Sequence, residues 1–234
     1  MDLRDIRTCL VVMAHPDDAE FSAGGTVAAW AEAGARVHYV IVTDGSKGSA
    51  DPGMTPERLA ALREAEQRAA AARLGVATVD FLGFPDGEVE ANLHLRHAIT
   101  REIRRRRPDV VVTHDPASLY WDHYINHPDH RAVGQATLDA VFPTARDRLH
   151  APQLLVEGLD PHVVRQVFLG GSQHPDTWID IEGTFERKLA ALREHTSQIH
   201  DQAALARRLR ERHSALAEGR PMAMAEVFKR ISFG

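Results

Sequence analysis

Short apolar runs alternate with longer helical patterns along the first half of the chain. Strands are expected at residues 10–14, 37–43, 79–82 and 110–113, because each run is rich in β-branched or other apolar side chains. Helices are expected between these runs: one that Gly34 closes, one from the Thr55-Pro56 cap to the residue before Gly75, and one over 92–107 that Pro108 stops. This alternation predicts an α/β fold, with a mostly parallel sheet and helices on both faces.

The pattern is weaker in the second half of the chain. Residues 154–156, 163–169 and 178–181 are interpreted as shorter strands, and 163–171 is open to two readings, an edge strand or a hairpin. Residues 185–216 form a charge-rich stretch with helical spacing. No internal repeat, low-complexity segment or linker divides the sequence. Residues 1–234 are therefore expected to form a single domain.

Polar residues stand at or soon after the end of each predicted strand of the first half. These residues are His15, Asp44, Asp86 and His114. Because ligands of open α/β sheets collect outside the carboxyl ends of the strands, this edge is the expected site. The His114-Asp115 pair keeps two readings, the lining of a pocket and the ordinary polarity of a loop.

The tripeptide His-Pro-Asp occurs three times, and two copies have a metal-ligand residue three places after the histidine. His15 is followed at this spacing by Asp18, and His127 by His130. The third copy, at His174, has no such residue and serves as an internal control, since the tripeptide alone is common at turns and helix starts. Residues three apart at a helix start can converge on one point, and imidazole with carboxylate suits a divalent ion such as zinc.

This donor set fits an open catalytic centre better than a closed structural one. His15, Asp18 and His130 would be three protein ligands, which leaves a position for a water molecule whose pKa such a metal lowers to about 7. Asp17 is adjacent to Asp18 and cannot point the same way. It would lie close to that water, where it could act as a general base.

The second motif supplies two further candidates for the chemistry. His127 would lie near the metal, where an imidazolium can stabilise an oxyanion and protonate a leaving amine, and Asp129 could orient or charge its ring. The structural alternative for both motifs is that acids after a strand cap a helix and favour its dipole. Two half-sites at strand ends of one α/β pattern favour metal binding over that alternative.

Composition and charge narrow the class of protein. The chain has 234 residues and a net charge of −5, so its overall field implies neither nucleic acid nor an anionic membrane as a partner. No run is long enough to span a bilayer, and the start of the sequence lacks a signal-peptide pattern. The single cysteine, Cys9, cannot form an internal disulfide. A cytoplasmic enzyme is expected.

The motifs extend into a longer set of matches. They comprise Ala14-His15-Pro16-Asp17-Asp18 with Gly24-Gly25-Thr26, His127-Pro128-Asp129-His130, Thr43-Asp44-Gly45, the helix from Arg63-Glu64-Ala65 to Leu74-Gly75-Val76, Phe81-Leu82-Gly83, Pro85-Asp86-Gly87 and the segment 188–198. In these residues the chain resembles the PIG-L/LmbE-like zinc-dependent N-deacetylases. The resemblance implies a Rossmann-like sheet and removal of acetyl groups from N-acetylglucosamine-type amino sugars. Some members of that family cleave a related amide in thiol-sugar conjugates.

The resemblance also implies a role for each matching residue. The zinc ligands would be His15, Asp18 and His130, and Asp17 would be the general base. His127, with Asp129 behind it, would stabilise the tetrahedral intermediate. Arg63 and Asp86 would hold sugar hydroxyls. For Arg63 the alternative is a solvated charge on an amphipathic helix. Some members place a mobile tyrosine two residues before the position of His127, where this chain has Ile125.

Several other signals have a mainly structural interpretation. The basic run 104–107 is expected to be solvated and to offset a helix dipole rather than bind an anion. His195, Gln198 and Glu226 are interpreted as structural or pocket-wall residues. The aromatic residues at 120, 121 and 124 could stack on a sugar face or pack their own loop. No G-x-G-x-x-G follows the first strand, which disfavours a nucleotide-binding domain.

The leading hypothesis is a zinc-dependent hydrolase that removes an N-acyl group, first of all N-acetyl, from an amino sugar or sugar conjugate. Ferrous iron is the alternative metal. The expected partner is a small-molecule amino sugar, with no nucleic acid and no membrane, and a homo-oligomer stays open. Two alternatives remain, an amidase of thiol-sugar conjugates on the same scaffold and a non-catalytic sugar- or metal-binding module. Intact Asp17 and His127 speak against the second, because binding alone needs neither.

Overall fold

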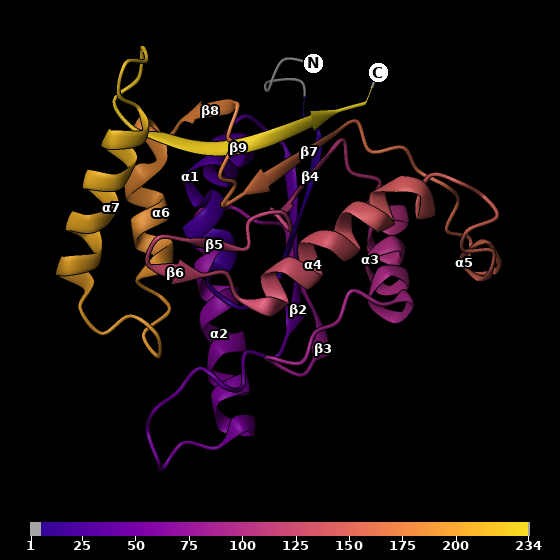
Figure 1. Ribbon diagram of the computed structural model, residues 1–234, viewed down its shortest axis with the longest axis horizontal. Coiled ribbons are helices and arrows are strands. Elements are labelled where there is room, and N and C mark those ends of the chain that lie inside the picture. The colour runs from indigo at the N-terminus through magenta and orange to yellow at the C-terminus, as the bar shows by residue number, and fades with distance from the viewer. Residues whose placement is uncertain (1–5, 234) are drawn as a thin grey trace.

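A seven-stranded sheet in the order β3-β2-β1-β4-β7-β9-β8 forms the centre of the molecule (Figure 1). The structure is a computed structural model, and it describes residues 6–233. The strands are β1 (Thr8–Met13), β2 (Arg36–Thr43), β3 (Thr78–Phe84), β4 (Val110–His114), β7 (Gln166–Gly170), β8 (Thr177–Asp180) and β9 (Ala225–Ser232), and a separate hairpin pairs β5 (Tyr120–Trp121) with β6 (Tyr124–Ile125). Strands β3, β2, β1, β4 and β7 are mutually parallel, whereas β9 runs antiparallel to both β7 and β8. The predicted mostly parallel sheet is confirmed.

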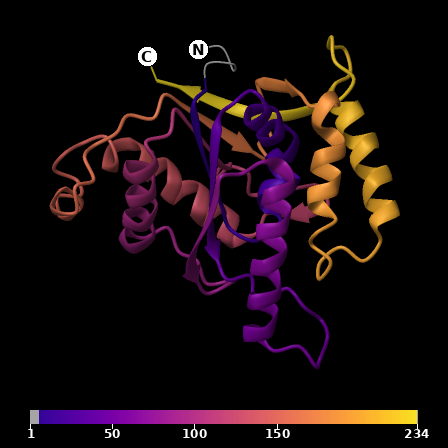
Figure 2. The same ribbon diagram turned by 180° about the vertical axis from the view of Figure 1, so that it is seen from behind.

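Helices cover both faces of this sheet, as Figures 1 and 2 show from opposite sides. Within residues 6–233 they are α1 (Asp18–Glu32), α2 (Pro56–Leu74), α3 (Leu93–Arg106), α4 (Pro128–Asp139), α5 (Gln153–Val156), α6 (Phe185–Leu192) and α7 (Gln202–Leu216), and a π turn at Ala140–Thr144 and a 3₁₀ turn at Glu182–Thr184 accompany them. Strand β1 contributes to the hydrophobic core on each face of the sheet, because its successive side chains point to opposite faces. Val11 packs with Trp30 of α1, and Val12 packs with Ile99 of α3. None of the helices in residues 6–233 has the length and apolar character of a membrane span.

Local capping explains where the predicted helices begin and end. Thr55 accepts a hydrogen bond from the backbone N–H of Arg58 at the start of α2, and Gly75 ends that helix with a φ of 80°. Asn92 caps α3 in the same way. These ends were expected from the sequence, since side-chain caps and a left-handed glycine satisfy groups that a helix terminus leaves unpaired.

Two predictions for the second half were wrong. Residues 154–156 belong to the short helix α5, which at one turn is too short to show a helical period. The stretch 185–216 is helical as expected, and the chain turns within it between α6 and α7. Strand β7 lies between β4 and β9, so it is neither an edge strand nor part of a hairpin. Strand β9, which pairs with β7, was not predicted from the sequence.

The prediction of a solvated basic run fails at Arg104. Its side chain is only 2% exposed and lies beneath the irregular segment that follows α4. The guanidinium donates to the backbone carbonyls of residues 144, 145, 147, 151 and 159. These carbonyls lie mostly outside regular helices and strands and need donors when buried, so one arginine organises the whole segment.

The topology places the expected site at a switch point of the sheet. From β1 the chain builds outward through β2 and β3, and it then returns to add β4 on the other side of β1. The connections after β1 and β4 therefore diverge, which opens a crevice at their carboxyl ends. His15 follows β1, and His114 ends β4.

Candidate active site

Three candidate ligands, from segments more than a hundred residues apart, meet at this crevice. His15 follows β1, Asp18 begins α1, and His130 lies in the first turn of α4. The Nδ1 atom of His15 lies 3.2 Å from Nε2 of His130. The Asp18 carboxylate reaches both rings, with Oδ2 3.3 Å from Nδ1 of His15 and Oδ1 3.2 Å from Nε2 of His130. These atoms form a group that could hold a metal ion.

The spacing of these donors fits a small divalent ion. A tetrahedral zinc with bonds of about 2.0–2.1 Å has ligand atoms about 3.3–3.4 Å apart. The 3.2 Å between His15 Nδ1 and His130 Nε2 is close to that edge length, and each of these two nitrogens lies 3.2–3.3 Å from one oxygen of the Asp18 carboxylate. Two imidazoles and one carboxylate are also a donor set that suits zinc or ferrous iron.

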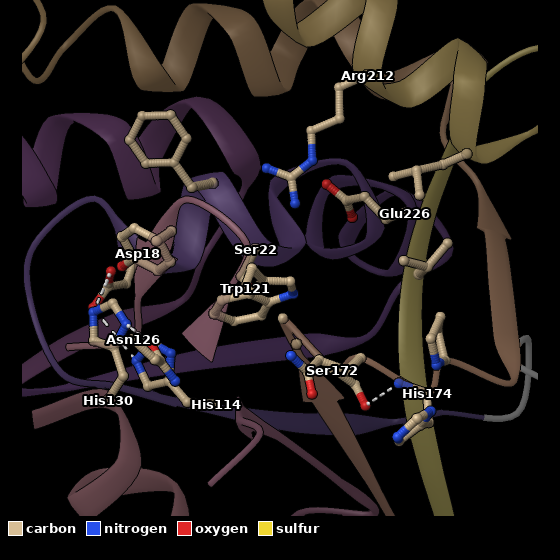
Figure 3. A pocket seen from close by; sticks show the side chains of 18 of the residues that line it. Asp18, Ser22, His114, Trp121, Asn126, His130, Ser172, His174, Arg212 and Glu226 are labelled. Atoms are coloured by element: carbon tan, nitrogen blue, oxygen red, sulfur yellow. Dashed lines mark hydrogen bonds and ion pairs between the residues drawn. The ribbon is translucent and has the colours of Figure 1, made fainter. Parts of the chain in front are cut away.

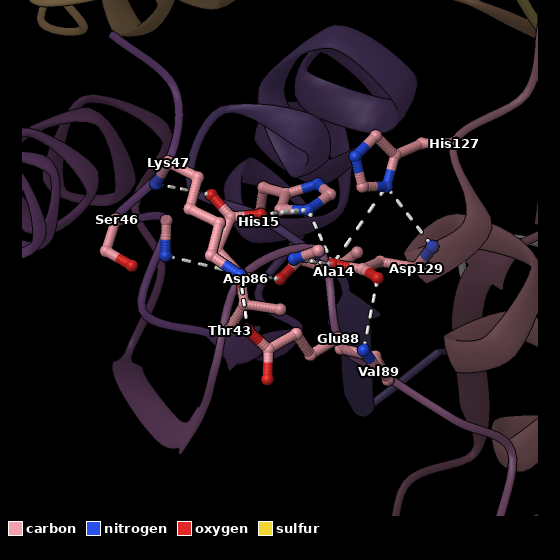
Figure 4. A network of polar contacts seen from close by, with 12 residues as sticks. Ala14, His15, Thr43, Ser46, Lys47, Asp86, Glu88, Val89, His127 and Asp129 are labelled. Atoms are coloured by element: carbon pink, nitrogen blue, oxygen red, sulfur yellow. Dashed lines mark hydrogen bonds and ion pairs between the residues drawn. The ribbon is translucent and has the colours of Figure 1, made fainter. Parts of the chain in front are cut away.

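The outer nitrogens of both rings have partners that orient the inner ones. His15 Nε2 lies 3.1 Å from a carboxylate oxygen of Asp129 and 3.1 Å from one of Asp86 (Figure 4). His130 Nδ1 lies 3.2 Å from Oδ1 of Asn126. Because a carboxylate or an amide oxygen accepts, each outer nitrogen is a donor, so the inner nitrogen of each ring is the one that would offer its lone pair to a metal. Asn126 was not found from the sequence. Its position four residues before His130 was the available signal.

The aspartates around His15 favour positive charge at this point. Burial acts to lower the pKa of His15, but hydrogen bonds to carboxylates outweigh it and raise the pKa to about 12. The partners are Asp129, Asp18 and Asp86. The same carboxylates would stabilise a divalent cation.

His114 belongs to the floor of the site. Its ring stacks on that of His130, with centroids 4.1 Å apart and planes 6° apart. Its Nε2 accepts a hydrogen bond from the backbone N–H of Ala14, so that lone pair is occupied. Burial lowers the pKa of His114 to about 4 and keeps the ring neutral. Of the two readings of His114, the structure supports the first: its buried ring lines the pocket and stacks on His130.

Asp17 lies next to the three candidate ligands but faces another way. One oxygen of its carboxylate lies 3.4 Å from Nη2 of Arg63, and its backbone has a φ of 90°. Burial, together with the negative charge of Asp18, raises the pKa of Asp17 to about 7. A carboxylate with a pKa near the working pH can both accept and release a proton.

His127 and Asp129 have different surroundings from each other. His127 caps α4, and its Nδ1 accepts a hydrogen bond from the backbone N–H of Asp129. Burial, then the charge of His15, lower the pKa of His127, which disfavours the imidazolium expected from the sequence. Because Nδ1 accepts a hydrogen bond, Nε2 is the ring nitrogen that can donate. The Asp129 carboxylate is 4.0 Å from His127 Nδ1 and bonds instead to His15 and to the backbone N–H groups of Gly87 and Val89.

Arg63 and Asp86, the expected sugar contacts, are both buried. Arg63 donates from Nη1 to the carbonyl of Gly45 and from Nη2 to that of Pro16. Asp86 accepts from the backbone N–H of Lys47 in addition to its contact with His15. Arg63 is therefore not a solvated helix charge, and both residues border the crevice through contacts within the protein.

A cavity of about 940 Å³ opens beside the candidate ligands (Figure 3). Asp18 and His130 line one end of it, and Glu226 lines it further away. Trp121 and Tyr124, from the β5–β6 hairpin, form part of the wall. This volume is near the upper end for pockets that hold drug-sized ligands, which makes it far larger than an acetyl group needs.

The remaining residues singled out in the sequence are mostly structural. His195 is fully buried against Glu20, and Glu226 forms a buried ion pair with Lys188. Gln198 donates to the carbonyl of Gly48. The control tripeptide at His174 lies at the cavity wall and is absent from the candidate metal groups among the described residues.

Comparisons with known proteins point in one direction. The family model described as PIG-L, GlcNAc-PI de-N-acetylase, matches residues 10–141, more than half of the chain. A diacetylchitobiose deacetylase of Thermococcus kodakarensis is 34% identical over 83% of this chain and 71% of its own length. A 1D-myo-inositol 2-acetamido-2-deoxy-alpha-D-glucopyranoside deacetylase of Acidothermus cellulolyticus is 32% identical over 83% of this chain and 80% of its own length.

Solved structures agree on the fold. The N,N'-diacetylchitobiose deacetylase of Pyrococcus horikoshii superimposes with a TM-score of 0.90 at 30% identity, over 98% of this chain and 85% of that one. The 4-carboxy-2-hydroxymuconate hydratase GalB of Pseudomonas putida, 24% identical with a TM-score of 0.80 over 97% of both chains, shares the fold alone. Because a hydratase shares this fold, the fold alone does not specify a reaction. By the family model, the relatives and the structure together, this chain belongs to the PIG-L family.

Proposed function

We propose that this protein is a zinc-dependent hydrolase that removes an N-acetyl group from an amino sugar or an amino-sugar conjugate. The observation that carries the proposal is the convergence of His15, Asp18 and His130 into a group that could hold one metal ion, with Asp17 beside them and facing another way. Relatives at 34% and 32% identity are named as deacetylases of acetylated amino sugars, which supports the same substrate class here.

The proposed roles follow from the positions of the side chains. When bound by the three ligands, a divalent ion supplies Lewis acidity, which polarises an amide carbonyl and acidifies water. Asp17 accepts a proton from the attacking water and passes it to the amine as the C–N bond breaks. His127 donates a hydrogen bond from Nε2 to the developing oxyanion. Asp129 and Asn126 hold the rings of His15 and His130 in the tautomers that bind a metal.

The cavity supports a substrate that extends beyond the acetyl group. An acetylated disaccharide or a sugar conjugate would fill much more of about 940 Å³ than an acetamide would. The half-buried ring of Trp121 and the exposed ring of Tyr124 offer faces on which a sugar can stack. We keep Arg63 and Asp86 as candidate sugar contacts, since both border the crevice next to His15 and Asp17.

Metal analysis followed by a deacetylation screen tests the proposal. The purified protein is expected to hold about one zinc or iron per chain and to release acetate from acetylated disaccharides or N-acetylglucosamine conjugates. A chelator should abolish release, and added zinc should restore it. A panel member with a sugar–cysteine amide separates the deacetylase from the thiol-conjugate amidase. A metal-loaded protein that leaves the whole panel intact would overturn the proposed activity.

A further inference from the structure

The backbone at Asp17 has a conformation that side chains other than glycine rarely adopt. Its φ is 90° and its ψ is −25°. Among residues 6–233, Arg107 is the other non-glycine residue with positive φ, and it ends helix α3. Such a conformation persists only where the surrounding structure holds it in place. At Asp17 the holding contacts can be named.

Two side chains of α2 form hydrogen bonds with the two ends of a single peptide group. Nη2 of Arg63 donates to the carbonyl of Pro16 at 2.7 Å, and Oε1 of Gln67 accepts from the N–H of Asp17 at 2.9 Å. This carbonyl and this N–H belong to the same peptide unit, which joins Pro16 to Asp17. Arg63 and Gln67 are four residues apart and therefore share one face of α2. The plane of the peptide is fixed from both sides.

Further buried hydrogen bonds hold the side chain of Gln67 in place. The amide nitrogen of Gln67 donates to Oε1 of Glu20 at 2.9 Å, and Oε2 of Glu20 lies 3.3 Å from Nε2 of His195. All three side chains are inaccessible to solvent. Because a carboxylate accepts, Gln67 must direct its nitrogen to Glu20 and its oxygen to Asp17. The chain from His195 to Gln67 thus leaves only one orientation for the Gln67 amide.

The rotation of this peptide sets the direction of the Asp17 side chain. Asp18, one residue later, begins α1 and points at His15 and His130. Adjacent side chains always diverge, and the positive φ of Asp17 sets the particular direction that its carboxylate takes relative to that of Asp18. Without these hydrogen bonds to the peptide, an ordinary φ would move the Asp17 carboxylate.

We propose that Gln67 and Arg63 are positioning residues that clamp the Pro16–Asp17 peptide and thereby aim the Asp17 carboxylate. The inference rests on the proposed function of Asp17 as general base. It also gives the fully buried Glu20 and His195 a purpose, namely to hold Gln67. Sugar binding by Arg63 would be a separate property of the same side chain.

Steady-state kinetics of Gln67→Met test the clamp. We expect kcat to fall about 10–100-fold, because a displaced catalytic group reacts slowly, while KM and the metal content per chain stay within about twofold. Glu66→Gln is the matched control. Glu66 is the neighbouring buried residue of α2 and holds Thr196 and Ser197, so this variant loosens the same helix without touching the peptide. It should keep kcat within about twofold.

Two further variants separate positioning from loss of packing. The exchange Glu20→Gln with Gln67→Glu restores an acceptor for the Asp17 N–H and a donor–acceptor pair between residues 20 and 67, so it should regain most of the lost kcat. In an Asp17→Asn background, Gln67→Met should cost at most about twofold more, since Gln67 acts through Asp17. An undiminished loss in that background, or a rise in KM at constant kcat, would refute the clamp.

A crystal structure of Gln67→Met keeps the clamp testable if the wild-type protein hydrolyses none of the acetylated sugars. In that case the proposed activity fails, and the backbone alone decides the clamp. A φ of Asp17 that leaves the positive region in the variant supports the clamp. A φ that stays near 90° overturns it, whatever the activity.

Discussion

Two adjacent aspartates with different partners are the main feature at the scale of single residues. Asp18 contacts the rings of His15 and His130, whereas Asp17 contacts Arg63 and no candidate metal ligand through its carboxylate. The same residue type can thus supply a ligand and a proton acceptor side by side. Substituting each in turn separates the two roles.

Asp17→Asn should lower kcat by about 10²–10⁴-fold, the usual contribution of a general base, and should leave about one metal per chain. Asp18→Asn should instead lose most of the metal, because it removes a ligand. Elemental analysis and acetate release, measured on both variants, check this. Loss of metal from Asp17→Asn would make Asp17 a ligand and break the assignment.

The buried side chain of His213 is expected to make the free energy of unfolding depend on pH. Burial, followed by the positive charge of Lys188, lowers the pKa of this histidine to about 4, whereas an unfolded chain has a value near 6.5. Between these pH values the unfolded state binds more protons, so the free energy of unfolding falls as the pH drops. The loss from this residue reaches at most about 3 kcal/mol by pH 4.

Urea unfolding of wild type and His213→Asn between pH 7 and 4.5 measures this effect. Asparagine can keep the donor that His213 Nδ1 offers to the carbonyl of Ala225. The variant should lose stability less steeply as the pH falls. Equal slopes for the two proteins would show that His213 does not titrate on unfolding.

At the scale of elements, a buried ion pair joins α1, α6 and β9. Lys188 of α6 donates to Glu226 of β9 at 2.6 Å and to the carbonyl of Phe21 in α1. Glu226 accepts in turn from the backbone N–H groups of Gly25 and Thr26. A side chain at Gly25 would overlap Ile181, so this glycine lets Ile181 pack closely against α1. The pair therefore fixes the helix that carries Asp18.

Lys188→Met should destabilise the protein by about 3–5 kcal/mol, because it leaves the Glu226 carboxylate buried without its counter-ion. Lys229→Met is the matched control. It removes a half-exposed pair with Asp176, and such pairs contribute about 0–1 kcal/mol. Denaturant unfolding compares the two variants. A similar small loss in both would show that the buried pair contributes no more than a surface one.

At the scale of the whole molecule, a metal would link two distant parts of the chain. The segment after β1 supplies His15 and Asp18, and α4 supplies His130. An ion that binds only the folded arrangement stabilises it by an amount that grows with the logarithm of the ratio of free ion to Kd. Folding and metal binding are therefore expected to be coupled.

Zinc at about 100 times its Kd should raise the free energy of unfolding by about 2.7 kcal/mol, seen as a higher melting temperature. The shift should disappear in His130→Ala and persist in His200→Ala, which alters an exposed histidine. Thermal unfolding with and without zinc provides the measurement. An equal shift in both variants would place the bound ion elsewhere.

The sequence by itself determined the strands of the first half, the edge of the sheet at which the site lies, and the two motifs that meet there. These features are local: apolar runs, capping residues and a ligand three places after a histidine can be recognised without neighbours in space. Tertiary structure alone decided which polar side chains are buried and what they contact. The local sequence around each of four such residues does not specify its role; they are Arg104, His114, Asn126 and Gln67. Their roles come from partners that, for all but Asn126, lie far away along the chain, because burial and hydrogen bonding depend on how distant segments pack.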